Sequence, residues 1–221
     1  MGDGRQRRHH WPPINEEPAI TDRRSRRHEA TRQEILEVAW SLARDRGLTG
    51  WSLREVAQSV GMRAPSLYVY FDSKDAIYDA MFAQGYQQLL SRIEVVDRTD
   101  DPTEDLRRGA HVFFDFCVEE PARHQLLFLR VIPGFVPSPQ AYDLAQQALD
   151  ELRGVLASAG MASQETVDLW TAVMTGLATQ QVSNDPGGAR WAVLVDHAVD
   201  LLLAGANDVP HAATTSATPP R

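Results

Sequence analysis

Apolar residues recur at helical spacing through most of the chain. In the first such segment Ile35, Val38, Ala39 and Leu42 form one stripe, and Gly47 follows it as a residue that suits the left-handed end of a helix. The same period predicts helices over about 27–46, 74–92, 102–118, 140–159, 164–183 and 190–204. No segment shows the two-residue alternation of a strand convincingly. Pro121 is interpreted as the end of the helix over 102–118, and a short apolar segment follows from Leu126 to Ile132. Together with this segment and two shorter helices between residues 52 and 71, these elements predict an all-α chain of about nine helices.

The two shorter helices are predicted between residues 52 and 71. Ser52 and Glu55 have the spacing of a capping box, in which each side chain bonds the backbone N–H of the other residue. Gly61 is placed to end this first helix, and Pro65 is tolerated in the first turn of the second. A helix, a turn and a second helix form the helix-turn-helix layout, whose second helix enters the DNA major groove.

Charge is unevenly distributed along the 221 residues. The net charge is −8, yet residues 1–75 hold 13 basic and 11 acidic side chains, whereas residues 76–221 hold 9 and 19. The segment assigned to DNA is therefore mildly positive. A dense basic run, Arg23, Arg24, Arg26 and Arg27, precedes the first predicted helix. We interpret it as an arm on the phosphate backbone or in the minor groove, with a solvated helix start or a generic charged tail as the alternative.

These patterns divide the chain into four parts. We expect a disordered N-terminal extension over 1–22, a helix-turn-helix domain over 23–75, a helical domain over 76–205 and a disordered tail over 206–221. The single cysteine, Cys117, excludes an intramolecular disulfide. No run of about 18 apolar residues predicts a membrane span, and no apolar stretch follows the N-terminal arginines as in a signal peptide. A cytoplasmic protein without membrane contact is expected.

The run from the first predicted helix to the fourth resembles the TetR/AcrR family of bacterial transcriptional regulators. The resemblance rests on Gly47, on the segment 52–57 (SLREVA), on Gly61-Met62, and on Leu67-Tyr68-Val69-Tyr70-Phe71 followed by Lys74. It implies an N-terminal three-helix DNA-binding domain and a larger C-terminal helical domain for effector binding and dimerisation. The remaining two thirds of the chain match this family only in being helical.

The resemblance also implies roles for individual residues of the helix-turn-helix. Ser52 is expected to contact a phosphate, as are Tyr68, Tyr70 and Lys74, whereas Arg63, Ala64 and Ser66 open the recognition helix near base edges. The alternative for the two tyrosines is an ordinary place in the core. Arg63 departs from the Ser or Thr that the family often uses as the cap of this helix, and Tyr70 replaces a more frequent His.

The C-terminal domain offers candidates for a pocket and a dimer interface. An apolar effector cavity is expected among aromatic residues and a methionine, although each is also a plausible core residue: Phe113, Phe114, Phe116, Phe128, Phe135, Trp170 and Met174. A homodimer is expected through apolar residues of the last two helices: Leu169, Val173, Leu177, Trp191, Leu194, Val195, Ala198, Val199 and Leu202. A dimer would present two recognition helices to two half-sites.

We therefore predict a dimeric transcriptional regulator that binds operator DNA, a repressor released by a small apolar effector. Two other classes stay open at this stage: a regulator whose second domain binds a protein partner or nothing, and an all-α enzyme. The sequence holds no HExxH, no phosphate-binding glycine loop and no nucleophile elbow, so we expect no catalytic residue, metal site or cofactor. Cys117, among apolar neighbours, is interpreted as a buried structural thiol.

Overall fold

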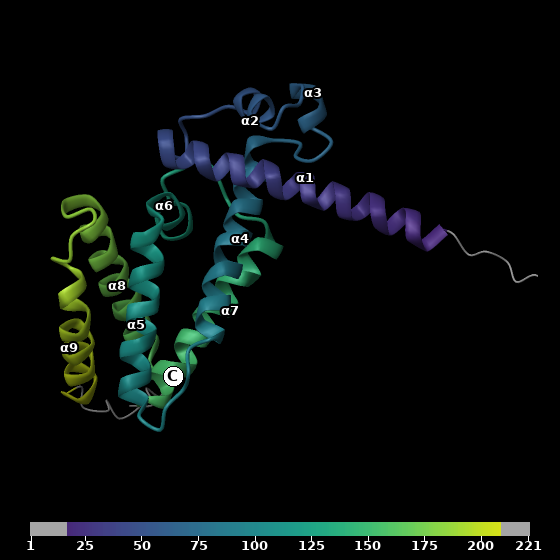
Figure 1. Cartoon of the computed structure of the whole chain (residues 1–221). Helices are drawn as coiled ribbons and strands as arrows, with labels where there is room; N and C mark the ends of the chain where they lie inside the picture. The colour runs from purple at the N-terminus through teal and green to yellow at the C-terminus, as the bar shows by residue number, and fades with distance from the viewer. Residues whose placement is uncertain (1–16, 209–221) are drawn as a thin grey trace, which may run out of the picture.

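The computed structural model describes residues 17–208, with side chains from 23 to 205, and this part of the chain is entirely helical. Short α2 and α3 lie across one end of the molecule, α1 crosses beneath them, and α4 runs from this end into the bundle of later helices (Figure 1). The elements are α1 (Glu17–Arg46), α2 (Leu53–Ser59), α3 (Ala64–Leu67), α4 (Lys74–Glu94), α5 (Pro102–Glu119), α6 (Pro121–Phe128), α7 (Pro139–Ser158), α8 (Gln164–Asn184), a short 3-10 turn (Ala192–Leu194) and α9 (Val195–Asp208). The predicted all-α class is confirmed.

The helix-turn-helix forms as its capping residues predict. Ser52 accepts from the Glu55 N–H while the Glu55 carboxylate accepts from the Ser52 N–H, so the predicted capping box is complete. Gly61 adopts a φ of 76°, and the N–H of Met62 donates to the Ala57 carbonyl at 2.9 Å. This is a Schellman ending, which stops α2 and aims the chain toward α3.

The first helix starts ten residues earlier than predicted. It begins at Glu17 rather than near Arg27, so residues 17–22 of the expected disordered extension are helical. Pro18 falls in the first turn, where its missing N–H costs no hydrogen bond, and no Gly or Pro follows before Gly47. Residues 1–16 and 209–221, where the other disordered parts were expected, lie outside the described residues, and α9 extends to Asp208.

A helix missing from the prediction separates α5 from the loop before α7. Pro121 was interpreted as the end of a helix, but it occupies the first turn of α6 instead. The apolar segment expected from Leu126 to Ile132 is therefore half helix and half loop. This correction matters because α6 packs against α1, α4 and α5, at the junction of the two parts of the chain.

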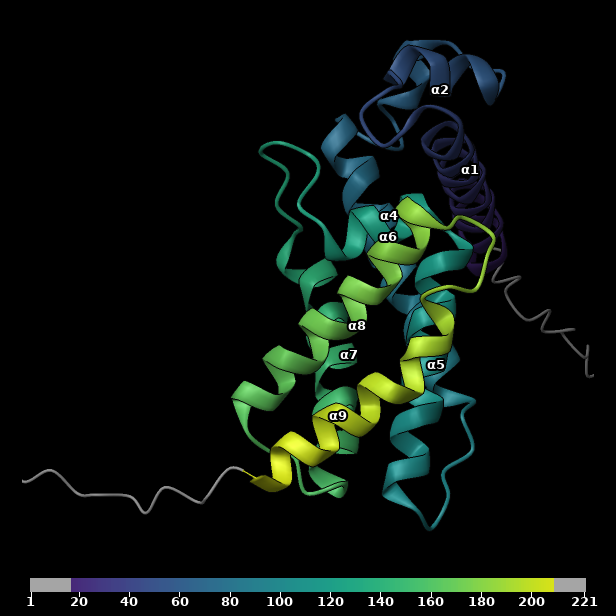
Figure 2. The same cartoon turned by 90° about the vertical axis from the view of Figure 1, so that its left-hand side faces the viewer.

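The later helices make a bundle beneath the helix-turn-helix. We call the helix-turn-helix part, α1 to the first turns of α4, the head, and the bundle from there to α9 the body. Helices α8 and α9 lie side by side across one outer face of the body (Figure 2). Within residues 17–208 no helix is both long enough and apolar enough to cross a bilayer.

Candidate nucleic-acid interface and effector cavity

The outer face of the head is formed by exposed residues of α3 and its flanks. Arg63 precedes the helix without a side-chain cap bond, so its guanidinium is not used to close the helix end. Ser66 and Tyr68 are exposed, the tyrosine by 55 %, and Ala64 is half-buried. Leu67, on the opposite face, is fully buried and anchors the helix. Of the predicted base-reading residues, Arg63 and Ser66 are therefore exposed, whereas Ala64 packs partly against the core.

Two of the predicted phosphate contacts already have partners within the head. The Ser52 hydroxyl accepts from the Glu55 backbone and donates to the Glu55 carboxylate at 2.8 Å. The Tyr70 ring stacks on His28 of α1 with ring centroids 4.7 Å apart. Both side chains therefore make contacts within the head. Of the two tyrosines, Tyr68 is the one exposed to solvent.

Lys74, the sole lysine of the sequence, lies folded against the loop between α1 and α2. Its ammonium donates to the carbonyls of Trp51 (2.7 Å) and Thr49 (3.2 Å) and sits 4.3 Å from the Trp51 ring centroid. Partial burial lowers the pKa of this ammonium below its usual value. The structure thus gives Lys74 an internal role, in tying the start of α4 to the loop, that the phosphate assignment did not predict.

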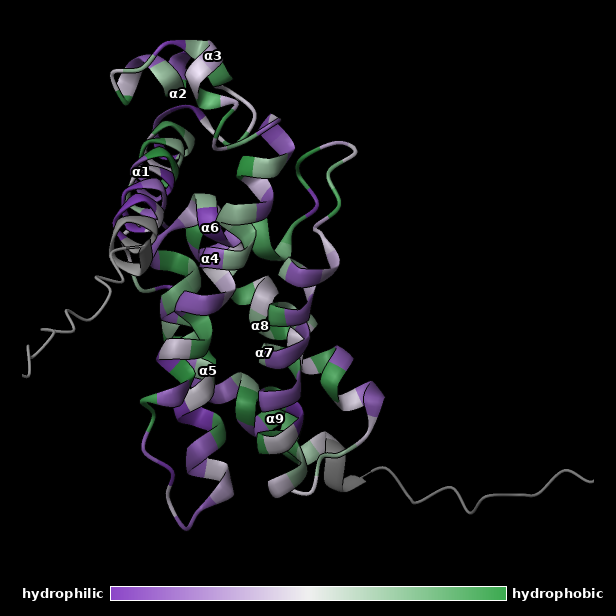
Figure 3. Cartoon of the chain, turned by 90° about the vertical axis from the view of Figure 1, so that its right-hand side faces the viewer, coloured by the Kyte–Doolittle hydropathy of each residue, from purple (hydrophilic) through white to green (hydrophobic). Residues whose placement is uncertain are grey.

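The basic run lies on α1 rather than in an extended arm. Arg23, Arg24, Arg26 and Arg27 are all exposed on this helix, whose N-terminal part projects away from the rest of the molecule (Figure 1). Figure 3 shows hydrophilic colour along much of α1. The run thus forms the exposed start of a helix. Contact of these arginines with DNA phosphates or with the minor groove stays a prediction.

An apolar cavity of about 290 Å³ lies in the body between α4, α5, α6, α7 and α8. Phe113, Phe128, Trp170 and Met174 line it, as predicted for the effector pocket. Further lining residues were not anticipated: Tyr86, Leu89, Ile93, Leu106, Tyr142, Leu149, Glu151, Leu152 and Val155. We call this space the inner cavity.

Three predicted pocket residues lie elsewhere. Phe114 and Phe116 are 1 % and 0 % exposed in the core and do not line the inner cavity, so for them the core alternative holds. Phe116 is instead packed under the Arg123 guanidinium, 3.6 Å from its ring centroid. Phe135 belongs to the loop between α6 and α7 and lines an adjoining space of about 660 Å³, the outer cavity.

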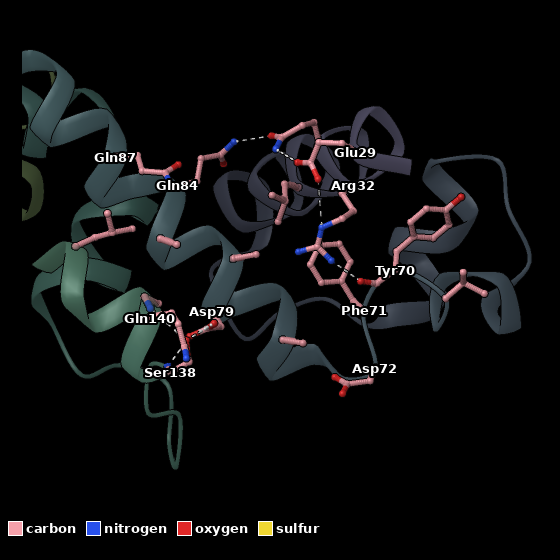
Figure 4. Close-up of a pocket in the computed structure, with 18 of the residues that line it drawn as sticks. Glu29, Arg32, Tyr70, Phe71, Asp72, Asp79, Gln84, Gln87, Ser138 and Gln140 are labelled. Atoms are coloured by element: carbon pink, nitrogen blue, oxygen red, sulfur yellow. Dashed lines mark hydrogen bonds and ion pairs between the residues drawn. The ribbon is translucent and has the colours of Figure 1, made fainter. Parts of the chain in front are cut away.

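A groove of about 770 Å³ marks the junction of head and body (Figure 4). On its head side, Arg32 of α1 donates to the Tyr70 carbonyl at 2.6 Å and lies over the Phe71 ring at 4.2 Å. On its body side, the carboxylate of Asp79 in α4 accepts from both the N–H (2.6 Å) and the hydroxyl (2.8 Å) of Ser138. Because Ser138 caps α7, this carboxylate ties α4 to the N-terminus of α7.

The outer face of α8 and α9 carries exposed apolar side chains. Among the predicted dimer residues, Leu169 and Leu194 are exposed by 49 % and 37 %, and five others are half-buried: Val173, Leu177, Trp191, Ala198 and Leu202. Val195 and Val199 are 0 % exposed and fill the core of the protomer, so their assignment to an interface was wrong. Leu201, exposed by 60 %, was missed.

Three comparisons show what this architecture is similar to. Residues 35–81, from α1 into α4, match the family model described as bacterial regulatory proteins, tetR family. The helix-turn-helix part of the chain matches the TetR family. Solved structures of similar fold include a TetR/AcrR-family regulator from Thermobifida fusca, with a TM-score of 0.56, 21 % identity and coverage of 79 % of this chain and 97 % of that one. Another is FadR from Bacillus subtilis in complex with stearoyl-CoA, with a TM-score of 0.65, 17 % identity and coverage of 78 % and 98 %.

Relatives from sequence comparison are named as transcriptional regulators. Rv1816 of Mycobacterium tuberculosis is 26 % identical over 171 residues, which cover 73 % of this chain and 65 % of that protein. The activator FasR of Mycolicibacterium smegmatis is 29 % identical over 126 residues, 56 % of each chain. The chain thus spans just under two thirds of the length of Rv1816.

Sequence reasoning missed two exposed residues of this TetR-family head. Val69, in the turn that follows α3, is 70 % exposed, and its aliphatic side chain beside Tyr68 suits contact with a thymine methyl group. Arg54 on α2 is exposed as well, near the N-terminus of that helix. An apolar residue between two tyrosines was the available signal for Val69.

Cys117 and His124 are buried in the body. Burial raises the pKa of the Cys117 thiol and lowers the pKa of the His124 imidazole, so both are held in their neutral forms. His124 contacts the Thr179 hydroxyl through Nε2 at 3.0 Å. The expected structural thiol at Cys117 is confirmed by its burial.

Proposed function

We propose that this TetR-family chain is a dimeric repressor, released from its operator when a small apolar molecule fills the inner cavity. The observation that carries the proposal is the double role of α4. Its first turns hold Ile77 and Tyr78 in the core of the head, while Tyr86, Leu89 and Ile93 farther along line the cavity. A ligand that shifts the second half of α4 therefore moves the head as well.

Two contacts support this route from cavity to head. The Asp79 carboxylate holds the N-terminus of α7, the helix that contributes Leu149, Leu152 and other cavity residues. The Tyr78 ring meets Phe135 of the α6–α7 loop with centroids 5.6 Å apart. Displacement of α7 or of this loop would reach α4 just below the head. The proposal then requires a change in the separation of two recognition helices in a dimer.

The dimer is proposed through the outer face of α8 and α9. Leu169, Leu194 and Leu201 expose apolar area there. Apart from the chain neighbours of Gly176 and the nearby backbone of α8, no heavy atom lies within 4 Å of a methyl group placed on Gly176. Small and exposed apolar residues on two adjacent helices suit close packing against the same face of a second copy. A protein with aspartate at both Leu194 and Leu201 is expected to sediment as a monomer, whereas aspartate at exposed Ala157 should leave the dimer intact.

An apolar effector is supported by the lining of the inner cavity. Phe113, Phe128, Trp170 and Met174 surround it, and Glu151 is the only charged residue among its lining. The FadR structure of similar fold holds stearoyl-CoA, a molecule with a long apolar chain. The relatives differ in the direction of regulation: FasR is named an activator and Rv1353c of Mycobacterium tuberculosis, 22 % identical, a repressor.

Binding of the purified protein to a duplex from the region upstream of its own gene tests the DNA-binding part. We expect tighter binding to this duplex than to a scrambled one, with affinity falling as salt rises. Arg63→Ala should lower affinity for the preferred duplex by about tenfold or more, since a bidentate arginine–guanine contact gives ~1–3 kcal/mol of discrimination. Arg190→Ala, in the body between α8 and α9, serves as the matched control.

The outcome of this titration separates two claims. If Arg63→Ala weakens the specific and scrambled duplexes equally, Arg63 does not read bases, although the head still binds DNA. Equal wild-type affinity for both duplexes would place the operator elsewhere. Absence of binding to either duplex at low salt would contradict the proposed function. Transcription of a reporter behind the bound duplex then distinguishes repression from activation.

A further inference from the structure

The arginines of the body are almost all paired with carboxylates. Residues 76–205 hold eight arginines, in a part of the chain with a large excess of acidic residues. Six of them form ion pairs: Arg92, Arg98, Arg107, Arg108, Arg123 and Arg153. Arg190 lies over the ring of its neighbour Trp191. Arg130 alone, although exposed, makes neither an ion pair nor a hydrogen bond with any part of the chain that the structure describes.

Arg130 lines the outer cavity. This space lies under the α6–α7 loop, where Phe82 and Tyr86 of α4 face Val131, Ile132 and Phe135 of the loop. Every other residue of its lining is uncharged, so the guanidinium is the single charge at an otherwise apolar site. An arginine left without a carboxylate in so acidic a body is available to an anion from outside the chain.

The outer and inner cavities adjoin each other. Tyr86, Phe128, Tyr142 and Ala145 line both of them. The Phe128 ring stands edge-on to Tyr86 (5.9 Å) and to Phe113 (5.1 Å), so it forms part of the wall between the two spaces. Phe128 is only half-buried and Tyr142 is exposed, so neither side chain is locked by packing on all sides. A narrow flexible chain is the shape that passes between such side chains.

We propose that the effector is a single-chain carboxylic acid amphiphile, with its carboxylate on Arg130 and its alkyl chain running through the outer cavity into the inner one. The inference rests on the proposed function and names the chemical class of its ligand. Carboxylate geometry matches the two parallel N–H donors of a guanidinium. Glu151 at the inner cavity is paired with Arg98 at 3.6 Å, so it offers little to a cationic ligand.

Calorimetric titration of the DNA-free protein with three ten-carbon probes tests the head-group site. Decanoate, decanol and decyltrimethylammonium share the alkyl chain and differ in charge. We expect decanoate to bind about fivefold more tightly than decanol, the upper end for an ion pair at an exposed arginine. Arg130→Gln should remove this advantage and leave decanol unchanged. Arg190→Gln, the matched loss of an arginine without a carboxylate partner, should behave as wild type.

Chain length tests the path into the inner cavity. Each added methylene from octanoate to dodecanoate should strengthen binding by up to about fourfold as long as new apolar contacts are gained. Ala145→Phe adds a ring at the junction of the two cavities. In this variant, the increase in affinity per methylene should end at a shorter chain length than in the wild type. Circular dichroism confirms that the variant is folded.

Several results would overturn the assignment. Equal decanoate affinity of wild type and Arg130→Gln would remove the head-group site, and tightest binding of decyltrimethylammonium would indicate a cationic ligand class. If none of the three probes binds, the proposed path through the outer and inner cavities is wrong as a whole. Because DNA is absent from these titrations, failure here leaves the operator measurements unaffected, and failure of DNA binding leaves the ligand site standing.

Discussion

The head and the body differ in how completely their cores are filled. In the head, Trp51 and Tyr78 are 4 % and 2 % exposed, meet edge to face at 5.3 Å, and are covered by the Lys74 ammonium. In the body, residues of five helices line a cavity of about 290 Å³. A surface that reads DNA needs a rigid support, whereas a sensor needs space for its ligand. In the proposed function the same chain provides both, because α4 joins the closed core of the head to the open core of the body.

Truncation of one leucine in each part tests this contrast most directly. Leu67→Ala in the head should lower the free energy of unfolding by ~2–5 kcal/mol, because Leu67 is fully buried and leaves a new cavity. Leu149→Ala in the body should cost about 1 kcal/mol, since this half-buried side chain already borders empty space. Urea unfolding followed by circular dichroism measures both. Equal losses would mean that the body is as tightly packed as the head.

Lys74 provides a second test, of whether its role is internal or on DNA. Lys74→Met should lower the free energy of unfolding by ~1–3 kcal/mol, because the carbonyls of Thr49 and Trp51 lose their donor. Arg54→Met, which removes an exposed charge of the same head, should change stability by less than about 0.5 kcal/mol. A Lys74→Met protein of unchanged stability that binds DNA with a shallower salt dependence would instead support the phosphate contact.

His124 makes the stability of the body depend on pH through a buried imidazole. Burial lowers the pKa of His124 in the folded state, so below pH 6.5 the unfolded chain takes up a proton that the folded chain excludes. Stability should fall by up to about 2 kcal/mol between pH 7 and pH 5.

His124→Gln isolates this effect because glutamine can still bond the Thr179 hydroxyl. The variant should lose most of the pH dependence between pH 7 and pH 5. The carboxylates with lowered pKa values, Glu55, Asp105 and Glu119, contribute only at lower pH, as the pH falls from about 4.5. Retention of the full dependence in His124→Gln would assign it to another group.

The smallest effect is expected at the contact that joins the two parts. Asp79→Ala removes the acceptor for Ser138 and should reduce the effect of decanoate on DNA affinity about fivefold, or ~1 kcal/mol of coupling. Asp75→Ala, a matched carboxylate one turn earlier on α4, should leave the ratio of DNA affinities with and without decanoate unchanged. An unaltered ratio in Asp79→Ala would exclude this route between cavity and head.

Sequence patterns predicted the head far better than the body, for a physical reason. Ser52 with Glu55 and Gly61 specify their cap and turn through bonds to residues no more than five positions away, so local sequence is sufficient. The start of α1 was misplaced because a proline in a first turn resembles a proline that breaks a helix. Pro121 misled the prediction of α6 in the same way.

Residues of the cavity and of the outer face depend on contacts distant in sequence. Phe113 and Phe114 are adjacent aromatic residues on α5, yet the first lines the cavity and the second is 1 % exposed in the core. Likewise Leu194 faces solvent and Val195 fills the core. Apolar character alone does not tell these neighbours apart, because the direction of each side chain is decided by how α5, α8 and α9 cross.

The continuity of α4 also limits how such regulators can be recombined. A fragment ending at residue 75 would lose Ile77, Tyr78 and Met81, all of them buried, and would leave Trp51 without its aromatic partner. A hybrid that combines this head with the body of a related chain must therefore be joined after the first two turns of α4. A hybrid joined there keeps the complete core of the head. Its new body has to pack against Asp79 and against the opposite side of α4.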